Sequence, residues 1–112
     1  MDIEFTKESL NLNDVIVKNP ISTFYGRVKG TSMKGAGVDD GDLLVIDKSL
    51  EYKQGALAVC CINGEFTLKY IQKRDNKLYL VPANPDFQPI KVSEDDEFAI
   101  WGIVSYIVKK TF

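Results

Sequence analysis

The stretch ALAVCCINGEFTLKYIQ, residues 56–72, contains two runs of β character joined by Asn63-Gly64. Asn-Gly is the preferred pair for a two-residue type I′ turn, because that turn needs a positive φ at both positions. We therefore predict a β-hairpin with strands at 56–62 and 65–72. The segment Arg74-Asp75-Asn76-Lys77 predicts a second hairpin turn soon after it.

Similar runs, separated by turn residues, occur along the rest of the chain. They lie at residues 23–28, 43–47, 77–81, 88–92 and 98–108. No segment has the periodicity of a long amphipathic helix, and we expect at most one short helix, within 10–17, capped by Asn11 or Asn13. The sequence predicts a mainly β fold in which about seven short strands form curled or folded-over antiparallel sheets.

The last run, FAIWGIVSYIV at 98–108, is apolar on both faces of the expected strand. A strand of this kind needs a second layer or a partner subunit, so we expect a homodimer. Gly102 in its middle predicts a bulge or a close approach of another backbone.

The composition excludes several classes of function. The chain has 112 residues and no histidine, so it has neither a Ser-His-Asp triad nor a His-ligated zinc ion. Acid–base chemistry would fall to Lys, Tyr, Asp, Glu or Cys. A net charge of −2, from 14 Lys+Arg and 16 Asp+Glu, argues against direct binding to nucleic acid.

The two cysteines, Cys60 and Cys61, are neighbours and would point to opposite faces of a strand. We interpret them as reduced, mostly buried residues, which indicates a reducing compartment. The first 25 residues contain no apolar signal-peptide core, and the chain has no run of 18 apolar residues. These features predict a cytoplasmic protein that is not bound to a membrane.

Two places could carry chemistry. The turn GTSMKGAG, residues 30–37, has three glycines that leave backbone amides unobstructed beside Ser32, although such clusters usually mark ordinary loops. In the run 65–70, the alternation puts Thr67 and Lys69 on the polar face. That pattern alone favours a lysine in water; the alternative is a cleft lysine that loses its proton easily and hydrogen-bonds Thr67.

Taken together, several motifs in a fixed order resemble the catalytic domain of the LexA/UmuD family of self-cleaving serine peptidases. They are GTSM at 30–33, GVDDGDLLVID at 37–47, GEFTLK at 64–69, LVPANP at 80–85 and WGIV at 101–104. The resemblance runs from about Leu10 to the end of the chain. Residues 1–9 precede it and are polar, so we expect them to form a mobile arm. Within the family, residues 12–16 are most similar to the UmuD branch.

The resemblance implies a Ser-Lys dyad, with Ser32 as nucleophile and Lys69 as neutral general base. The backbone amides of Ser32 and Met33 would hold the oxyanion, and Thr67 and Gly30 would support the site. We interpret Asp39, Asp40 and Asp42 as turn residues, not as a third catalytic group, and we expect no metal and no cofactor.

The resemblance also implies partners. A UmuD-like protein would cleave its own N-terminal arm when stimulated by the RecA–single-stranded DNA filament in the SOS response to DNA damage. Its processed homodimer would serve a Y-family, UmuC-like translesion DNA polymerase. The alternatives are the C-terminal domain of a LexA- or phage-type repressor, or a dimerisation domain that does not use its dyad.

One feature departs from the family pattern. Family members are cut between a small residue and glycine, but this chain has no glycine before Gly26. Its only Ala-Gly pair, Ala36-Gly37, lies inside the glycine-rich turn. The sequence leaves three origins open: a processed form, a protein that is made short, or a fragment of a larger repressor.

Overall fold

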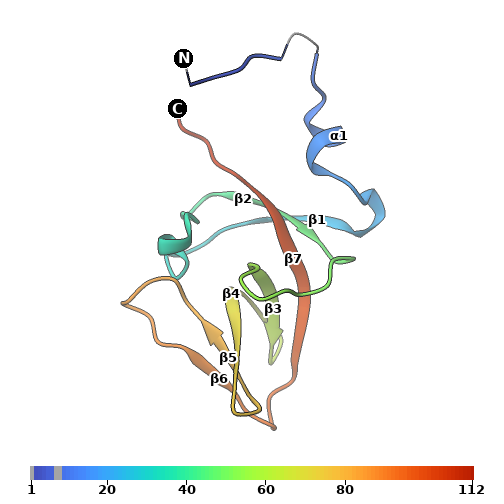
Figure 1. The fold of residues 1–112 in the computed structure, drawn as a ribbon. Helices are drawn as coiled ribbons and strands as arrows, with labels where there is room; N and C mark the ends of the chain where they lie inside the picture. The colour runs from blue at the N-terminus through green and yellow to red at the C-terminus, as the bar shows by residue number, and fades with distance from the viewer. Residues whose placement is uncertain (1, 7–8) are drawn as a thin grey trace.

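The computed structural model describes residues 2–6 and 9–112, and the fold is mainly β (Figure 1). Seven strands form one open antiparallel sheet in the order β1-β2-β7-β3-β4-β5-β6. Their bounds are β1 Thr23–Arg27, β2 Leu43–Asp47, β3 Ala58–Ile62, β4 Glu65–Arg74, β5 Lys77–Val81, β6 Ile90–Val92 and β7 Phe98–Val108. The predicted number of strands and their antiparallel arrangement are confirmed.

Strand β4 makes the sheet fold over, because it changes partner halfway along its length. Residues 65–69 pair with β3, whereas residues 70–74 pair with β5. The two hairpins form as predicted. Asn63 and Gly64 have φ of 50° and 82°, and Asp75 and Asn76 have φ of 50° and 64°.

Three predicted strand limits are wrong by two residues each. Strand β3 begins at Ala58 rather than at residue 56, because the turn at Gly55 (φ +89°) delays pairing. Strand β4 continues to Arg74, since the next turn needs only two residues. Strand β6 begins at Ile90, after Pro89, which has no N–H to donate to a ladder.

The only α-helix in the described part of the chain is α1, Leu12–Ile16. Asn11 caps it as predicted: its side chain accepts a hydrogen bond from the amide of Asn13. A 3₁₀ turn, η1 (Pro20–Ser22), follows and leads into β1. Of the predicted mobile arm 1–9, residues 1, 7 and 8 lie outside the described residues; the others are exposed and have no helix or strand.

A buried carboxylate attaches this N-terminal segment to the sheet. Asp47, at the end of β2, accepts hydrogen bonds from Asn19 Nδ2 (2.8 Å), Ser22 Oγ (2.9 Å) and the Ser49 amide (2.8 Å). These bonds, with that of Asn19 first, hold the pKa of Asp47 well below its usual range. The entry into β1 is therefore fixed relative to β2.

Two clusters of apolar side chains form the core on either side of β3. One contains Met33, Val38, Leu44, Ile46 and Val59. The other contains Ala58, Cys60, Ile71, Leu80 and Ile103. The first cluster anchors the loop that carries Ser32, because Met33 and Val38 are 3% and 0% exposed.

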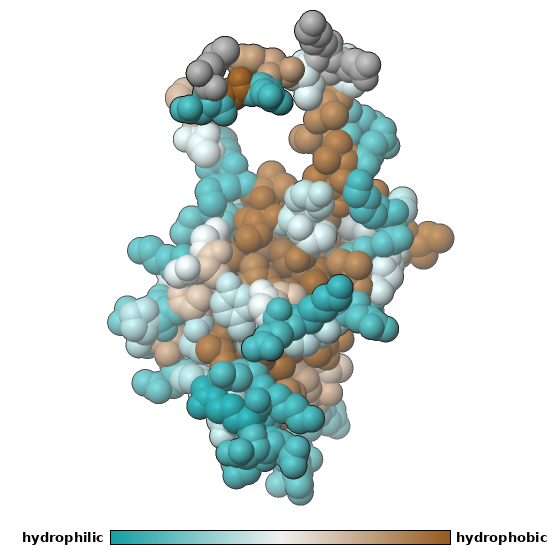
Figure 2. Space-filling view, in the orientation of Figure 1, coloured by the Kyte–Doolittle hydropathy of each residue, from teal (hydrophilic) through white to brown (hydrophobic). Residues whose placement is uncertain are grey.

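Strand β7 is not covered on both faces within one chain. Only Gly102 and Ile103 are buried, and Ile100, Tyr106 and Val108 are 40–43% exposed. The bulge expected at Gly102 is confirmed, because Val59 pairs with Gly102 whereas Cys60 pairs with Ile100. A Cβ atom at Gly102 would lie 2.6 Å from the side-chain atom Ile46 Cγ2. In the orientation of Figure 2, hydrophobic residues gather in the upper half of the molecule and the lower end is hydrophilic.

Candidate active site

The loop between β1 and β2 presents Ser32. It turns at Gly30, whose φ is +94° and whose amide donates a 2.7 Å hydrogen bond to Asp40 Oδ1. A 3₁₀ turn, η2 (Lys34–Ala36), follows Met33. Because Met33 is buried and Ser32 is half-buried, the serine hydroxyl lies at the boundary between the core and solvent.

The segment after β5 holds this loop in place. The Ala83 amide donates to the Ser32 carbonyl (2.8 Å), and the Gly35 amide donates to the Ala83 carbonyl (2.6 Å). Asn84 Nδ2 donates to the Thr31 carbonyl at 2.8 Å. We did not predict this support; its only signal in the sequence is the LVPANP motif, which the resemblance included without a role.

Lys69 reaches Ser32 from strand β4. Its Nζ donates to Ser32 Oγ at 2.9 Å, to Thr67 Oγ1 at 2.7 Å and to the Leu68 carbonyl at 3.1 Å. Lys69 is 7% exposed, so the interpretation of the alternation as a lysine in water is wrong. The Leu68 carbonyl is a further partner that sequence reasoning missed, and the residue pattern gives no signal for it.

The surroundings of Lys69 favour the neutral amine. Burial lowers the pKa of Lys69. The nearby thiol of Cys60 has a pKa that burial raises to about 11, so it stays protonated and offers no negative charge at neutral pH. Within the described residues, no carboxylate forms an ion pair with Lys69. A lysine in this state can accept a proton from an adjacent hydroxyl.

Two backbone amides, those of Ser32 and Met33, lie beside the hydroxyl. In the part of the chain that the structure describes, neither the Ser32 amide nor the Met33 amide donates a hydrogen bond. Free amides next to a nucleophile are the donors that an oxyanion requires. Their role as an oxyanion hole stays a prediction.

A cleft of about 530 Å³ leads to Ser32. Its floor is apolar and includes Leu44, Ile46 and Val59, and its rim includes residues 25–27 of β1. Strand β1 is an edge strand, with β2 as its only neighbour among the described strands. The cleft therefore lies beside an unpaired strand edge.

The hydrogen bonds at both ends of β1 show which backbone groups are unpaired. Lys48 N donates to the Ser22 carbonyl, and Val28 N donates to the Asp42 carbonyl, so even-numbered residues of this segment face β2. Because the direction alternates along a strand, Thr23, Tyr25 and Arg27 present their N–H and C=O groups to the free edge. An extended peptide can pair with such an edge.

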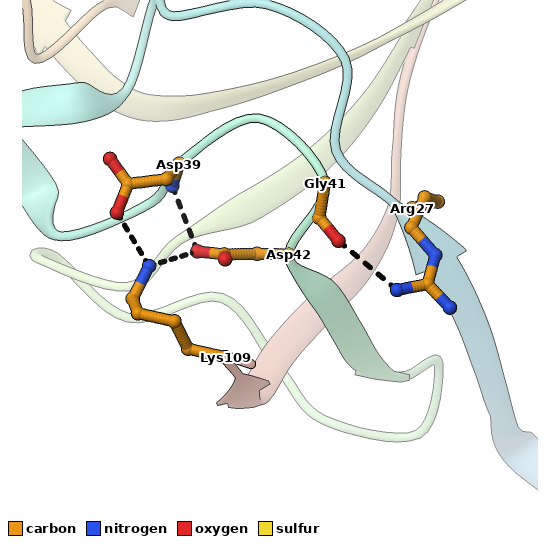
Figure 3. Close-up of polar contacts among 5 residues, drawn as sticks. All are labelled: Arg27, Asp39, Gly41, Asp42 and Lys109. Atoms are coloured by element: carbon orange, nitrogen blue, oxygen red, sulfur yellow. Dashed lines mark hydrogen bonds and ion pairs between the residues drawn. The ribbon is translucent and has the colours of Figure 1, made fainter. Parts of the chain in front are cut away.

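The three aspartates of the turn have structural contacts instead of contacts with Lys69, and those of Asp39 and Asp42 are drawn in Figure 3. Asp42 Oδ2 accepts from the Asp39 amide (2.8 Å) and from Lys109 Nζ (2.5 Å). The hydrogen bond from Lys109 is the main cause of the lowered pKa of Asp42. This ion pair ties the end of β7 to the turn, and the Asp40–Gly30 bond ties the turn to the serine loop.

Several known proteins are similar to this chain in sequence. A family model described as Peptidase S24-like matches residues 1–105. The chain belongs to this family. Protein MucA of Salmonella typhimurium is 39% identical over 91% of this chain and 70% of its own length. Protein SamA of the same species is 35% identical over 96% of this chain and 74% of its own length.

The LexA repressor of Bordetella avium is also similar, with 39% identity over 74% of this chain but only 39% of its own length. Membership of the S24-like family confirms the resemblance stated from the sequence, and it makes the chain a relative of self-cleaving serine peptidases. None of the helices in the described residues is long and apolar enough to span a membrane.

Proposed function

We propose that this chain is a UmuD-like serine peptidase that uses Ser32 as nucleophile and Lys69 as general base. The observation that carries the proposal is the 2.9 Å contact between Lys69 Nζ and Ser32 Oγ, made by an amine that is almost fully buried. Thr67 and the Leu68 carbonyl orient the amine, and Gly30 lets the serine loop turn.

In the first step, the neutral amine of Lys69 takes the hydroxyl proton of Ser32, and Oγ attacks the carbonyl carbon of the scissile bond. The amides of Ser32 and Met33 stabilise the oxyanion of the tetrahedral intermediate. The C–N bond then breaks, and the protonated Lys69 gives its proton to the leaving amine. Water, deprotonated by Lys69, releases the acyl group from Ser32.

The substrate is an extended segment that pairs with the free edge of β1. In the UmuD-like role, this segment is the N-terminal arm of a UmuD-like protein. The processed homodimer acts in the cytoplasm as accessory subunit of a Y-family, UmuC-like translesion polymerase. Cleavage is stimulated by the RecA–single-stranded DNA filament in the SOS response. The similarity to MucA and SamA over more than two thirds of their lengths favours this role.

A second candidate is the C-terminal dimerisation and self-cleavage domain of a repressor. It is supported by the similarity to LexA repressors, of which the matched region forms between 38% and 53%. The dyad chemistry would be the same in both cases. A longer reading frame that encodes a helix-turn-helix domain before residue 1 would favour the repressor, and an adjacent polymerase gene would favour the UmuD-like role.

The test of the dyad is cleavage in trans, followed by intact-mass analysis. The substrate is a full-length relative whose own catalytic serine is replaced by alanine, incubated with this chain between pH 7 and 10. We expect a cut between a small residue and glycine that becomes faster as pH rises, because more Lys69 is neutral. Ser32→Ala and Lys69→Ala should each reduce the rate by at least about 10³-fold. A cut that survives in either variant would exclude the proposed mechanism.

A further inference from the structure

An exposed group of aromatic side chains forms one wall of the cleft. Trp101 contacts Phe66 edge-on, with ring centroids 5.6 Å apart, and Phe24 edge-on at 5.1 Å. Phe66 and Trp101 both line the cleft that leads to Ser32. Phe66 is 62% exposed and Phe24 is 42% exposed, so this apolar wall is open to solvent instead of being part of the core.

A β-bulge positions Trp101 at this wall. Val59 pairs with Gly102 and Cys60 with Ile100, so Trp101 is the extra residue of β7. A bulge redirects the side chain of its extra residue, and such bulges are common beside functional sites. Because Gly102 has no Cβ, β7 approaches Ile46 closely at this point, next to the floor of the cleft.

The charges around the wall are positive. The residues that line the cleft include Arg27 and Lys29 but no carboxylate. The ammonium group of Lys48 lies 4.6 Å from the centre of the Trp101 ring. A peptide that enters the cleft therefore meets an apolar surface with cations on its rim, which attracts carboxylates over a range set by salt.

We propose that Trp101 determines specificity by contacting, together with Phe66, a bulky apolar side chain of an extended peptide, while the cationic rim attracts a carboxylate of the same peptide. The inference rests on the proposed function, because it names the substrate class of the same cleft. Burial of a bulky side chain against two aromatic rings removes much apolar surface from water, which discriminates against a small polar residue.

The test measures binding without cleavage. A Ser32→Ala protein is titrated into fluorescein-labelled Ser-Glu-Leu-Ala-Gly-Ser-Gly-Ser and into three variants, with Leu replaced by Ser, with Glu replaced by Gln, or with both changes. Fluorescence anisotropy gives the affinities. Emission of the unlabelled complexes gives a second readout, because Trp101 is the only tryptophan of the chain.

We expect the Leu-to-Ser change to weaken binding about tenfold, and Trp101→Ala to abolish that difference. Trp101→Phe should retain most of the preference for Leu. Phe87→Ala, which changes an exposed aromatic outside the cleft, should leave that preference unchanged.

The Glu-to-Gln change should weaken binding at 50 mM salt but not at 500 mM, and Lys48→Met should reduce that salt dependence. Thermal melting shows that each variant is folded.

Equal binding of all four peptides, no saturable binding of any, or an unchanged preference for Leu in folded Trp101→Ala would overturn the inference. Failure of the proposed function looks different. If the specificity pattern is found but protein with Ser32 intact never cuts the bound peptide or the full-length relative, the dyad mechanism fails and the specificity of the cleft stands.

Discussion

At the scale of single residues, Lys69 combines two opposing demands. A lysine on a polar strand face is expected to be charged and solvated, but Lys69 is almost fully buried. Among the described residues, its amine hydrogen-bonds only to neutral oxygen atoms. Burial lowers its pKa, so between that pKa and 10.5 the unfolded chain binds a proton that the folded chain does not. Burial of Lys69 therefore lowers the free energy of unfolding at neutral pH, but it makes the amine available as a base.

This cost predicts an effect of Lys69→Met. Below the folded-state pKa of Lys69 the destabilisation is fully present, and it disappears as pH rises to the unfolded value. The variant should therefore be more stable than the parent near neutral pH, on the order of 1 kcal/mol, and the two should converge by pH 10.5. Urea unfolding at several pH values gives the free energy of unfolding. Exposed Lys91→Met is the control, and a Lys69→Met protein that is less stable at neutral pH would contradict the prediction.

The glycine at position 35 shows a second demand on a single residue. A Cβ atom there would lie 2.5 Å from the Ala83 carbonyl oxygen, which also accepts the Gly35 amide. Only glycine allows this contact without a shift of the backbone. The fixed position of Ser32 thus depends on a residue without a side chain, far from Ala83 in the sequence.

At the scale of elements, the free edge of β1 is the feature most open to a direct test. Tyr25 directs its N–H to the open edge, whereas Gly26 faces β2. Proline at an edge position removes a donor without breaking a ladder bond of the protein itself. Proline at Tyr25 can therefore remove a backbone hydrogen bond to a substrate and leave the pairing of β1 with β2 intact.

We expect Tyr25→Pro to reduce peptide binding by the Ser32→Ala protein about tenfold, while its free energy of unfolding falls by less than about 1 kcal/mol. Tyr25→Ala separates the side chain from the N–H and should bind nearly as well as the parent. Gly26→Pro, which removes a ladder donor, should instead destabilise the fold. Unchanged binding by folded Tyr25→Pro would show that the substrate does not pair with this edge.

At the scale of the whole molecule, β7 connects both halves of the sheet with the cleft wall and the serine loop. It pairs with β2 and β3, carries the bulge at Trp101, and its end is tied by Lys109 to the turn beside the serine loop. Its outer part leaves Ile100, Tyr106 and Val108 exposed, which a single chain does not cover. This strand is where we expect a homodimer to form.

The dimer predicts that Tyr106→Asp combined with Val108→Asp yields a monomer, because two carboxylates on the apolar face would be buried in the interface. Sedimentation equilibrium of the parent and the variant measures the mass. Phe66→Asp, on an exposed aromatic of the cleft instead of the outer part of β7, is the control that should remain dimeric. A double variant that remains dimeric would place the interface elsewhere. A parent protein that is monomeric at micromolar concentration would exclude the dimer.

The sequence by itself determined the local structure of this protein. The turn pairs Asn63-Gly64 and Asp75-Asn76, the alternating runs and the cap at Asn11 all act between near neighbours, so their chemistry is readable in the chain. The ordered motifs identify Ser32 and Lys69 as the catalytic pair. The local pattern alone predicts only an ordinary loop residue at Ser32 and a solvated lysine at Lys69.

Only the tertiary structure decided where these side chains lie. The burial of Lys69 depends on β3 and β4 packing against the core, and the loop of Ser32 depends on Ala83 and Asn84, some 50 residues away. The wall at Trp101 arises from a bulge in the pairing of β3 and β7. Gly102 predicted a bulge or a close approach in this strand, but the pairing between strands decides that Trp101 is the extra residue. Propensity acts within a few residues, whereas burial, pKa and cleft shape are set by contacts between distant parts of the chain.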